Sequence, residues 1–182
     1  IAEEADTGDK HNHQPYLAYW NDKFYYQYLS GLYQEHTSPT RTSILTSEDG
    51  VNWSEPMVVF PVYELPEIKK DDIYIPAGMP AVMHQRMGFY IAPNGKLITS
   101  GFYSYSANPQ HSPNVGNGLG RVVREVRKDG SLGPIYFIRY NRHAGFNESN
   151  TNYPFYKESQ DKEFITACDS LLSNKLMIMQ WW

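Results

Sequence analysis

The fold is indicated by one stretch, DGVNWSEPMVVF (Asp49–Phe60), and by a related stretch that begins 80 residues later, DGSLGPIYFI (Asp129–Ile138). Each contains an Asp-Gly pair, a spacer, a proline and a run of four apolar residues. Asp-Gly favours a turn because Gly accepts positive φ and the Asp side chain bonds to nearby backbone N–H groups. The apolar run that follows is typical of a strand. The same turn-and-strand unit is therefore predicted twice.

Short apolar runs of this kind recur along the chain and flank other turn signals, such as Asn21-Asp22 and Pro93-Asn94-Gly95. Such pairs predict β-hairpins. No window shows a clean i, i+3, i+4, i+7 apolar stripe, so we expect almost no helix. The fold class is all-β, built from antiparallel hairpins. The predicted strands include Tyr16–Trp20, Lys23–Leu29, Arg41–Thr46, Met57–Phe60, Gly88–Ile91, Lys96–Tyr103, Arg121–Arg127, Ile135–Ile138, Phe164–Cys168 and Leu176–Met179.

Repetition of a four-stranded unit favours a β-propeller, in which roughly four to eight blades form a ring. The 182 residues have room for two to three blades. We therefore expect residues 1–182 to be a partial β-propeller domain, truncated at its C-terminus, where Lys175–Trp182 stops inside a predicted strand. The alternative is a complete β-sandwich with long loops.

The composition excludes several classes of protein. With aromatic residues at 15% of the chain, intrinsic disorder is excluded. A net charge of −4 argues against a broad nucleic-acid surface, and the sequence lacks the run of about 18 apolar residues that a membrane span needs. The single cysteine, Cys168, excludes an internal disulfide framework, and we expect it to be a small buried apolar residue.

The segment Ser47-Glu-Asp-Gly-Val-Asn-Trp53 resembles the Asp box of sialidase-like propellers. We expect Ser47 and Asp49 to accept hydrogen bonds from the turn backbone, Gly50 to adopt positive φ and Trp53 to fill the space below the hairpin. In those families the box is structural. A sialidase proper is less favoured, since the usual arginine triad cannot be recognised in the sequence.

Four motifs together resemble seven-bladed propeller enzymes that act on rhamnose–glucuronate linkages: HNHQPY (His11–Tyr16), YQEH (Tyr33–His36), GFYSYS (Gly101–Ser106) and GLGRVVREV (Gly118–Val126). That group contains the rhamnosyl-glucuronate lyases, the related α-L-rhamnosidases and the ulvan lyases. The resemblance covers most of this chain and implies a propeller fold and a carbohydrate-active enzyme.

The lyases of this group have two histidines, a tyrosine and an arginine in that order. The resemblance therefore implies that His13, His36, Tyr105 and Arg121 are catalytic. Tyr105 and Arg121 lie 16 residues apart, as in the lyases, although Tyr103 is an alternative equivalent of Tyr105.

Uronate elimination explains these residue types. The C5 proton next to the carboxylate is removed and the group on C4 leaves, so a cation has to neutralise the carboxylate. Arg121 would supply a bidentate, permanent charge. Tyr105 would act as base and then as acid, for which its pKa near 10 has to fall. The rhamnosidases imply another assignment, in which His13 alone transfers the proton in a hydrolysis.

Further candidates lie in or beside predicted loops. We expect Tyr33 and Tyr103 to stack on sugar rings, and His84 and His143 to contact substrate or metal. The pair His11-Asn12-His13 invites comparison with a metal-binding pair, but we expect only one of the two rings to face a given site.

The sequence thus predicts an enzyme that cleaves rhamnose–glucuronate linkages in an acidic plant or algal polysaccharide, by β-elimination in preference to hydrolysis. The alternatives are an α-L-rhamnosidase that uses His13 and a non-catalytic glycan-binding or sialidase-like propeller. The sequence identifies no cofactor with certainty and is compatible with a structural divalent cation. The substrate's size and the family resemblance imply a secreted or periplasmic location.

Overall fold

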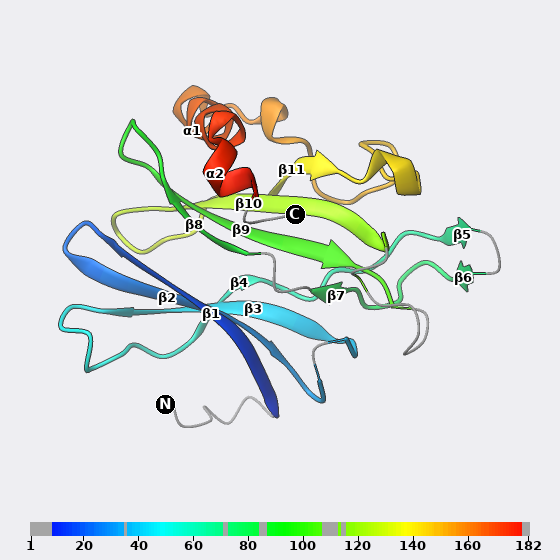
Figure 1. Ribbon diagram of the computed structural model, residues 1–182, viewed down its shortest axis with the longest axis horizontal. Coiled ribbons are helices and arrows are strands. Elements are labelled where there is room, and N and C mark those ends of the chain that lie inside the picture. Colours follow the sequence, from blue (N-terminus) through cyan, green and yellow to red (C-terminus); the bar gives the residue numbers. More distant parts are fainter. Residues whose placement is uncertain are drawn as a thin grey trace.

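The computed structural model describes residues 9–34, 36–70, 73–83, 87–106, 113 and 116–179. Its main feature is a pair of antiparallel sheets that lie one above the other, with two helices on the far side of the second sheet (Figure 1). Sheet 1 has the strand order β1-β2-β3-β4. Its strands are β1 (His11–Trp20), β2 (Lys23–Gly31), β3 (Thr40–Ser47) and β4 (Met57–Phe60).

Sheet 2 repeats this arrangement with the order β11-β10-β9-β7, and β8 also pairs with β9. The short strands β7 and β8 lie along different halves of β9, so they share one strand position. A separate hairpin, β5 with β6, lies beyond the main sheets. The bounds are β5 (Ile68–Lys70), β6 (Ile73–Ile75), β7 (Val82–Met83), β8 (Gly88–Ile91), β9 (Leu97–Ser104), β10 (Gly118–Val126) and β11 (Tyr136–Tyr140).

The predicted repeat is confirmed by this topology. Asp49 lies in the β3–β4 connection and Asp129 in the β10–β11 connection, which both join the third and fourth strand positions of their sheets. The all-β prediction is confirmed for the two sheets, which correspond to two blades.

The main core fills the space between the two sheets. Tyr25, Leu29 and Phe60 from sheet 1 pack with residues such as Val122 and Phe137 from sheet 2. The approach is close, since a Cβ at Gly101 of β9 would lie only 3.0 Å from Phe60 Cδ2. The buried Gln27 side chain also joins the sheets by donating to the Ser100 carbonyl at 2.9 Å.

The Asp box adopts the predicted turn. Asp49 Oδ1 accepts the backbone N–H groups of Val51 and Asn52, both at 2.8 Å, and Ser47 Oγ accepts that of Gly50 at 2.9 Å. Gly50 has φ +74°. Trp53 was expected to fill the space below the hairpin. In the structure its indole packs against Tyr26, and the residue remains 38% exposed.

The prediction of strands at 164–168 and 176–179 is wrong. These segments form helices α1 (Lys162–Ser173) and α2 (Lys175–Met179), and a short 3₁₀ helix, η3 (Tyr156–Glu158), precedes them. The buried residues of α1 are Phe164, Ala167, Cys168 and Leu171, which have the i, i+3, i+4, i+7 spacing of a helix face. Asp161 caps the helix by accepting from Phe164 N. The β-branched pair Ile165-Thr166 suggested a strand, but the cap and the apolar stripe outweigh it.

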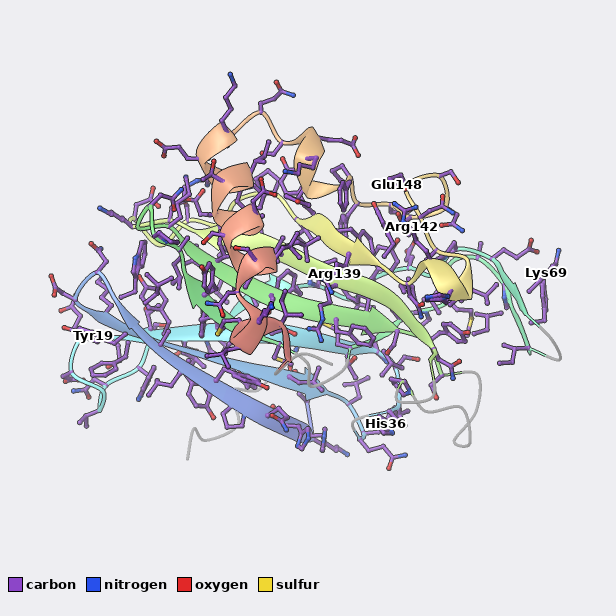
Figure 2. The ribbon with its side chains drawn as sticks, turned by 45° about the horizontal axis from the view of Figure 1, so that its top comes forward. Tyr19, His36, Lys69, Arg139, Arg142 and Glu148 are labelled. Atoms are coloured by element: carbon purple, nitrogen blue, oxygen red, sulfur yellow. The ribbon has the colours of Figure 1, made fainter. Side chains whose placement is uncertain are left out.

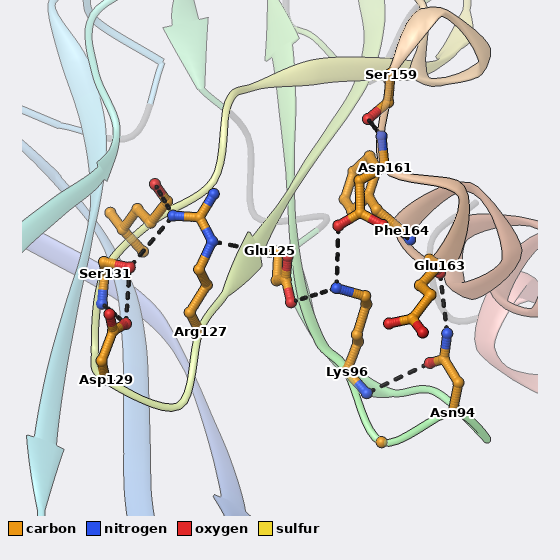
Figure 3. Close-up of polar contacts among 12 residues, drawn as sticks. Asn94, Lys96, Glu125, Arg127, Asp129, Ser131, Ser159, Asp161, Glu163 and Phe164 are labelled. Atoms are coloured by element: carbon orange, nitrogen blue, oxygen red, sulfur yellow. Dashed lines mark hydrogen bonds and ion pairs between the residues drawn. The ribbon is translucent and has the colours of Figure 1, made fainter.

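Helix α1 covers the outer face of sheet 2, where its apolar stripe packs on Ile98, Val123 and Ile138. Cys168 is buried there as predicted, and burial raises the pKa of its thiol. The N-terminus of α1 is held by Lys96, whose Nζ lies 2.9 Å from Glu125 Oε1 and 3.1 Å from Asp161 Oδ2 (Figure 3). None of the helices in the described ranges is long and apolar enough to cross a membrane.

Candidate functional site

The two sheets have two different ends. One end, which we call the turn end, carries the β1–β2, β3–β4, β8–β9 and β10–β11 connections. The other, the loop end, carries the start of β1, the β2–β3 and β9–β10 connections and the chain that follows β11. In Figure 1 these ends lie at the left and right, and in Figure 2 Tyr19 and His36 mark them.

The predicted site residues that the structure describes gather at the loop end because of this up-and-down topology. His13 lies near the start of β1, His36 between β2 and β3, Tyr105 just after β9, and Arg121 near the start of β10. Tyr33 and Tyr103 share this end, as does His143, which belongs to η2 (Arg142–Ala144). His84 lies outside the described residues.

These side chains differ widely in exposure. Tyr33 is 65% exposed and His143 is also exposed, whereas His13 and His36 are half-buried. Arg121 is only 6% exposed and Tyr105, which packs on Phe146, is fully buried. Tyr33 and His143 are therefore directly accessible to a ligand, His13 and His36 are partly accessible, and Arg121 and Tyr105 are covered by their neighbours.

Tyr103 belongs to the aromatic core in this structure. Its hydroxyl donates to the Pro61 carbonyl at 2.6 Å, and its ring packs between Tyr63 and Tyr153. Burial raises the pKa of Tyr103 well above its ordinary value. The side chain thus stabilises the packing of the two sheets, and its predicted sugar contact stays a prediction.

Strand β1 contains a β-bulge that shapes the site. The register with β2 shifts between His13 and Tyr16, and Gln14 has φ +49°. His13 is opposite Leu29 and Tyr16 is opposite Gln27, and both of these partners point into the core. The bulge therefore turns His13 and Tyr16 to the same face, towards sheet 2. Bulges commonly re-aim side chains next to active sites.

The prediction that only one of the rings of His11 and His13 faces a given site is wrong. The two rings stack with their centroids 5.6 Å apart and an angle of 27° between their planes. The physical reason is that residues two positions apart on a strand share a face. The loop end therefore contains an imidazole pair.

Arg121 brings a positive charge to the same region. It is directly opposite Arg139 of β11 and Phe102 of β9, with its Cζ 5.6 Å from the Phe102 ring centroid. Burial raises the pKa of Tyr16, and the positive charge of Arg121 acts in the opposite direction. Tyr16 and Arg139 are thus candidate site residues that the sequence analysis missed. The odd spacing of apolar residues around Gln14-Pro15 was the available signal for the bulge.

The arrangement can recognise an anion. Two arginines side by side on neighbouring strands place cationic groups at one point of a chain whose net charge is −4. Guanidinium groups bind carboxylates with two parallel hydrogen bonds. Within the described residues no group of three or more His, Cys, Asp or Glu side chains is placed to hold a metal ion, and a structural cation stays a prediction.

Comparisons with known proteins agree with the fold. Residues 2–182 match the family described as BT_1020-like, N-terminal beta propeller. A solved structure named "Sialidase" is 50% identical over 93% of this chain, with a TM-score of 0.88. The chain spans only 16% of that protein. No curated protein matches the sequence. Since the family match covers nearly every residue, the chain belongs to the BT_1020-like, N-terminal beta-propeller family.

Proposed function

We propose that this chain is part of a carbohydrate-active enzyme that cleaves a glycan at an acidic sugar, with the binding site at the loop end. The observation that carries this proposal is the 50% identity over 93% of the chain to a protein named Sialidase. That name denotes an enzyme acting on sialic acid, which is a sugar with a carboxylate. The sialidase-like alternative of the sequence analysis therefore becomes the better-supported one.

Arg121 is the residue that we assign to the sugar carboxylate. Its side chain comes from β10 at the loop end and is 6% exposed, so its charge is little screened by water. The neighbouring Arg139 adds a second positive charge on the adjacent strand. Two neighbouring cations, of which Arg121 is buried, favour a carboxylate over a neutral sugar substituent.

Hydrolysis also needs a proton for the leaving oxygen. His13 is the candidate donor, because histidine is the side chain that most often transfers protons near neutral pH. The bulge directs Tyr16 to the same face as His13, where its hydroxyl would contact the substrate. Sialidases are among the glycosidases that use a tyrosine nucleophile, which gives Tyr16 a second role to test.

A second candidate reaction is elimination at a rhamnose–glucuronate linkage. It is favoured by the presence of His13, His36, Tyr105 and Arg121 at one end of the sheets. In this reaction the Tyr105 oxygen takes the C5 proton, a double bond forms between C4 and C5, and the C4–O bond breaks. The leaving oxygen then receives the proton from Tyr105 while Arg121 neutralises the carboxylate.

One assay separates the two reactions. The full-length polypeptide that carries this sequence is incubated with sialylated glycans and with rhamnose–glucuronate glycans. Released acidic sugar and near-ultraviolet absorbance are both followed. Sugar release without absorbance supports hydrolysis, because only elimination creates an unsaturated uronate. An absorbance rise supports the lyase, and binding without turnover on every substrate supports a glycan-binding propeller and contradicts both reactions.

A further inference from the structure

The connection from β4 to β7 forms an arm that extends the loop end. It leaves sheet 1 after Phe60, the last residue of β4, and enters sheet 2 at Val82, the first residue of β7. Hairpin β5–β6 lies within this connection and projects beyond the main sheets (Figure 1), and Figure 2 shows Lys69 at the end of the molecule opposite Tyr19. We refer to residues 61–81 as the arm. Long connections of this kind often carry function.

The base of the arm is firmly anchored. Tyr63 is buried in the main core, and its hydroxyl accepts the backbone N–H of Asn152 at 2.8 Å. The two halves of the base bond to each other, since Leu65 N donates to Met79 O at 2.8 Å. A two-stranded hairpin alone is marginally stable in water, so this anchoring is what allows the arm to project from the sheets.

The two faces of the hairpin differ in their surroundings. Ile68 and Ile75 are opposite each other, and both are buried in the main core. The next pair, Lys69 opposite Tyr74, points to the other face, because successive side chains on a strand alternate. Tyr74 is 61% exposed and the Lys69 side chain is 68% exposed. The fold thus uses one face of the hairpin for packing and presents the other to solvent.

Three side chains form an ordered group on this exposed face. Glu67 Oε2 lies 3.0 Å from Lys69 Nζ, and the Tyr74 hydroxyl donates to Glu67 Oε1 at 3.4 Å. Lys69 Nζ lies 5.7 Å from the centre of the Tyr74 ring. Because an exposed ion pair contributes little to stability, the main effect of these contacts is to orient the ring. We refer to Glu67, Lys69 and Tyr74 as the arm cluster.

The arm cluster has the chemistry that recognises a neutral sugar. The C–H groups of a pyranose ring pack on a flat aromatic ring, and sugar hydroxyls bond to carboxylate and ammonium groups. The charges of Glu67 and Lys69 offset each other, so the cluster gives no electrostatic preference for an acidic sugar. Arg121 and Arg139, in contrast, bring two positive charges to another part of the loop end.

We propose that the arm cluster is a distal subsite that binds a neutral sugar of the same glycan whose acidic sugar binds at the loop end. This inference rests on the proposed function and narrows its substrate class to an oligosaccharide or polysaccharide that contains both neutral and acidic sugars. It is supported by the exposed aromatic ring, the offset charges and the anchoring of the arm at the loop end.

The test is affinity electrophoresis of the full-length polypeptide at low temperature, which measures binding without turnover. One gel contains a sialylated mucin, in which sialic acid is linked to neutral galactose, and a second contains a rhamnose–glucuronate polysaccharide. A third contains polysialic acid, which has acidic sugars alone. We expect the native protein to be retarded in the first or the second gel.

In the gel that retards the native protein, Tyr74→Ala should raise Kd by about 5- to 10-fold, the usual cost of truncating an aromatic contact residue. Tyr74→Trp should retain binding, because it keeps a flat ring. In the polysialic acid gel, Tyr74→Ala should behave like the native protein. Tyr19→Ala is the matched control, since Tyr19 is 56% exposed but lies at the turn end.

The opposite results overturn the proposal. These are equal retardation of the native protein and Tyr74→Ala, or no retardation of the native protein in either of the first two gels. A loss of the same size in the polysialic acid gel would also overturn it, because the arm would then not distinguish neutral from acidic sugars. Tyr74 is exposed, so its variants should keep the native melting temperature, and a loss of binding is then not a loss of folding.

Kinetics on the cleaved glycan give a second measurement. For an oligosaccharide, Tyr74→Ala should raise KM by a similar factor and leave kcat nearly unchanged, as the loss of a contact made equally in the ground and transition states does. For a substrate with only the acidic sugar and a small leaving group, both constants should be unchanged. Binding at the arm without any turnover would contradict the proposed function alone, whereas turnover with an unchanged oligosaccharide KM in Tyr74→Ala would contradict this inference alone.

Discussion

The turn end and the loop end are built from the same strands but use their polar residues differently. At the turn end, polar side chains bond to the backbone of their own turn, as Asp49 and Ser47 do in the Asp box. At the loop end, His13 and Tyr16 of β1 face sheet 2, and Arg121 of β10 lies with Phe102 on the face of sheet 2 that points away from sheet 1. The comparison teaches that the turn end supplies stability and the loop end supplies groups for chemistry, as is common for loops on a rigid scaffold.

The charges of the two ends follow the same division. Hydrogen bonds from the backbone of Asn52 and Val51 hold the pKa of Asp49 well below its usual range, so this carboxylate is already satisfied. Arg121 instead lies opposite another arginine. The Asp49 carboxylate thus serves its own turn, and the two guanidinium groups place positive charge on neighbouring strands of the loop end.

The largest expected effect on stability comes from a substitution in the core between the two sheets, which supports both ends. Phe60 of β4 is fully buried between the sheets, and Phe60→Ala should lower the free energy of unfolding by about 3–5 kcal/mol, as large-to-small core substitutions do. Chemical denaturation of the two proteins measures this loss. Met57→Ala on the same strand is the control, because Met57 is 39% exposed and should cost much less. Similar losses in both variants would show that Phe60 is not at the centre of the core.

Substitution of a site residue at the loop end should lower the catalytic activity. Arg121→Ala is expected to reduce kcat/KM by about 10²–10³-fold, the usual cost of removing one group that stabilises charge in the transition state. Steady-state kinetics on the substrate found in the assay above measure this. Arg142→Ala is the control at the same end, because the Arg142 side chain is largely exposed, pairs with Glu148 and lies over the Tyr140 ring. Full activity in Arg121→Ala would remove Arg121 from the site.

Substitutions at the turn end should lower the stability of the fold and leave the activity unchanged. Gly50 has φ +74°, a conformation that costs an L-residue about 1–2 kcal/mol, so Gly50→Ala should destabilise the protein by about this amount while kcat/KM stays unchanged. Thermal unfolding gives the size of the effect. Gly133→Ala is the control. Its added Cβ would make ordinary contacts of 3.4 Å or more, so this variant should lose less stability than Gly50→Ala. A loss of activity in Gly50→Ala without a loss of stability would break the division between the two ends.

The smallest effect concerns pH. Because the folded pKa of Asp49 is lowered, its contribution to stability is present above the ordinary Asp pKa of about 3.9 and is lost as the pH falls below it. The melting temperature of the native protein should therefore fall more steeply below pH 4 than that of Asp49→Asn. Glu48→Gln removes a neighbouring charge that is paired with Lys23, so it controls for charge alone. Parallel pH profiles for all three proteins would mean that the Asp-box bonds add no stability.

Much of the fold could be predicted from local signals. The hairpin at Asn21-Asp22 was predictable because both residues tolerate positive φ, which they adopt at 50° and 59°. The repeated Asp-Gly turns were recognisable for the same kind of reason. Helix α1 was not predicted, although the sequence contains its cap Asp161 and the helically spaced apolar residues Phe164, Ala167, Cys168 and Leu171, because the strand propensity of Ile165 and Thr166 was given more weight.

The candidate site was predictable only in part. The motif resemblance selected His13, His36, Tyr105 and Arg121, and the topology then placed all four at one end. Tyr16 and Arg139 could not be selected in this way. The position of Tyr16 depends on the bulge in β1, which is signalled in the sequence only by the spacing around Gln14-Pro15, and that of Arg139 depends on the pairing of β10 with β11.

The sequence by itself determined the turns, most strands, the repeated unit and the all-β class, because these depend on backbone preferences and two-residue periodicity within short segments. Only the tertiary structure decided which residues meet at the loop end, that Tyr103 and Tyr105 are buried, that α1 packs on sheet 2, and that one face of sheet 1 is open. The physical reason is that burial and contact are set by partners distant in sequence, so they exist only once the two sheets have packed together.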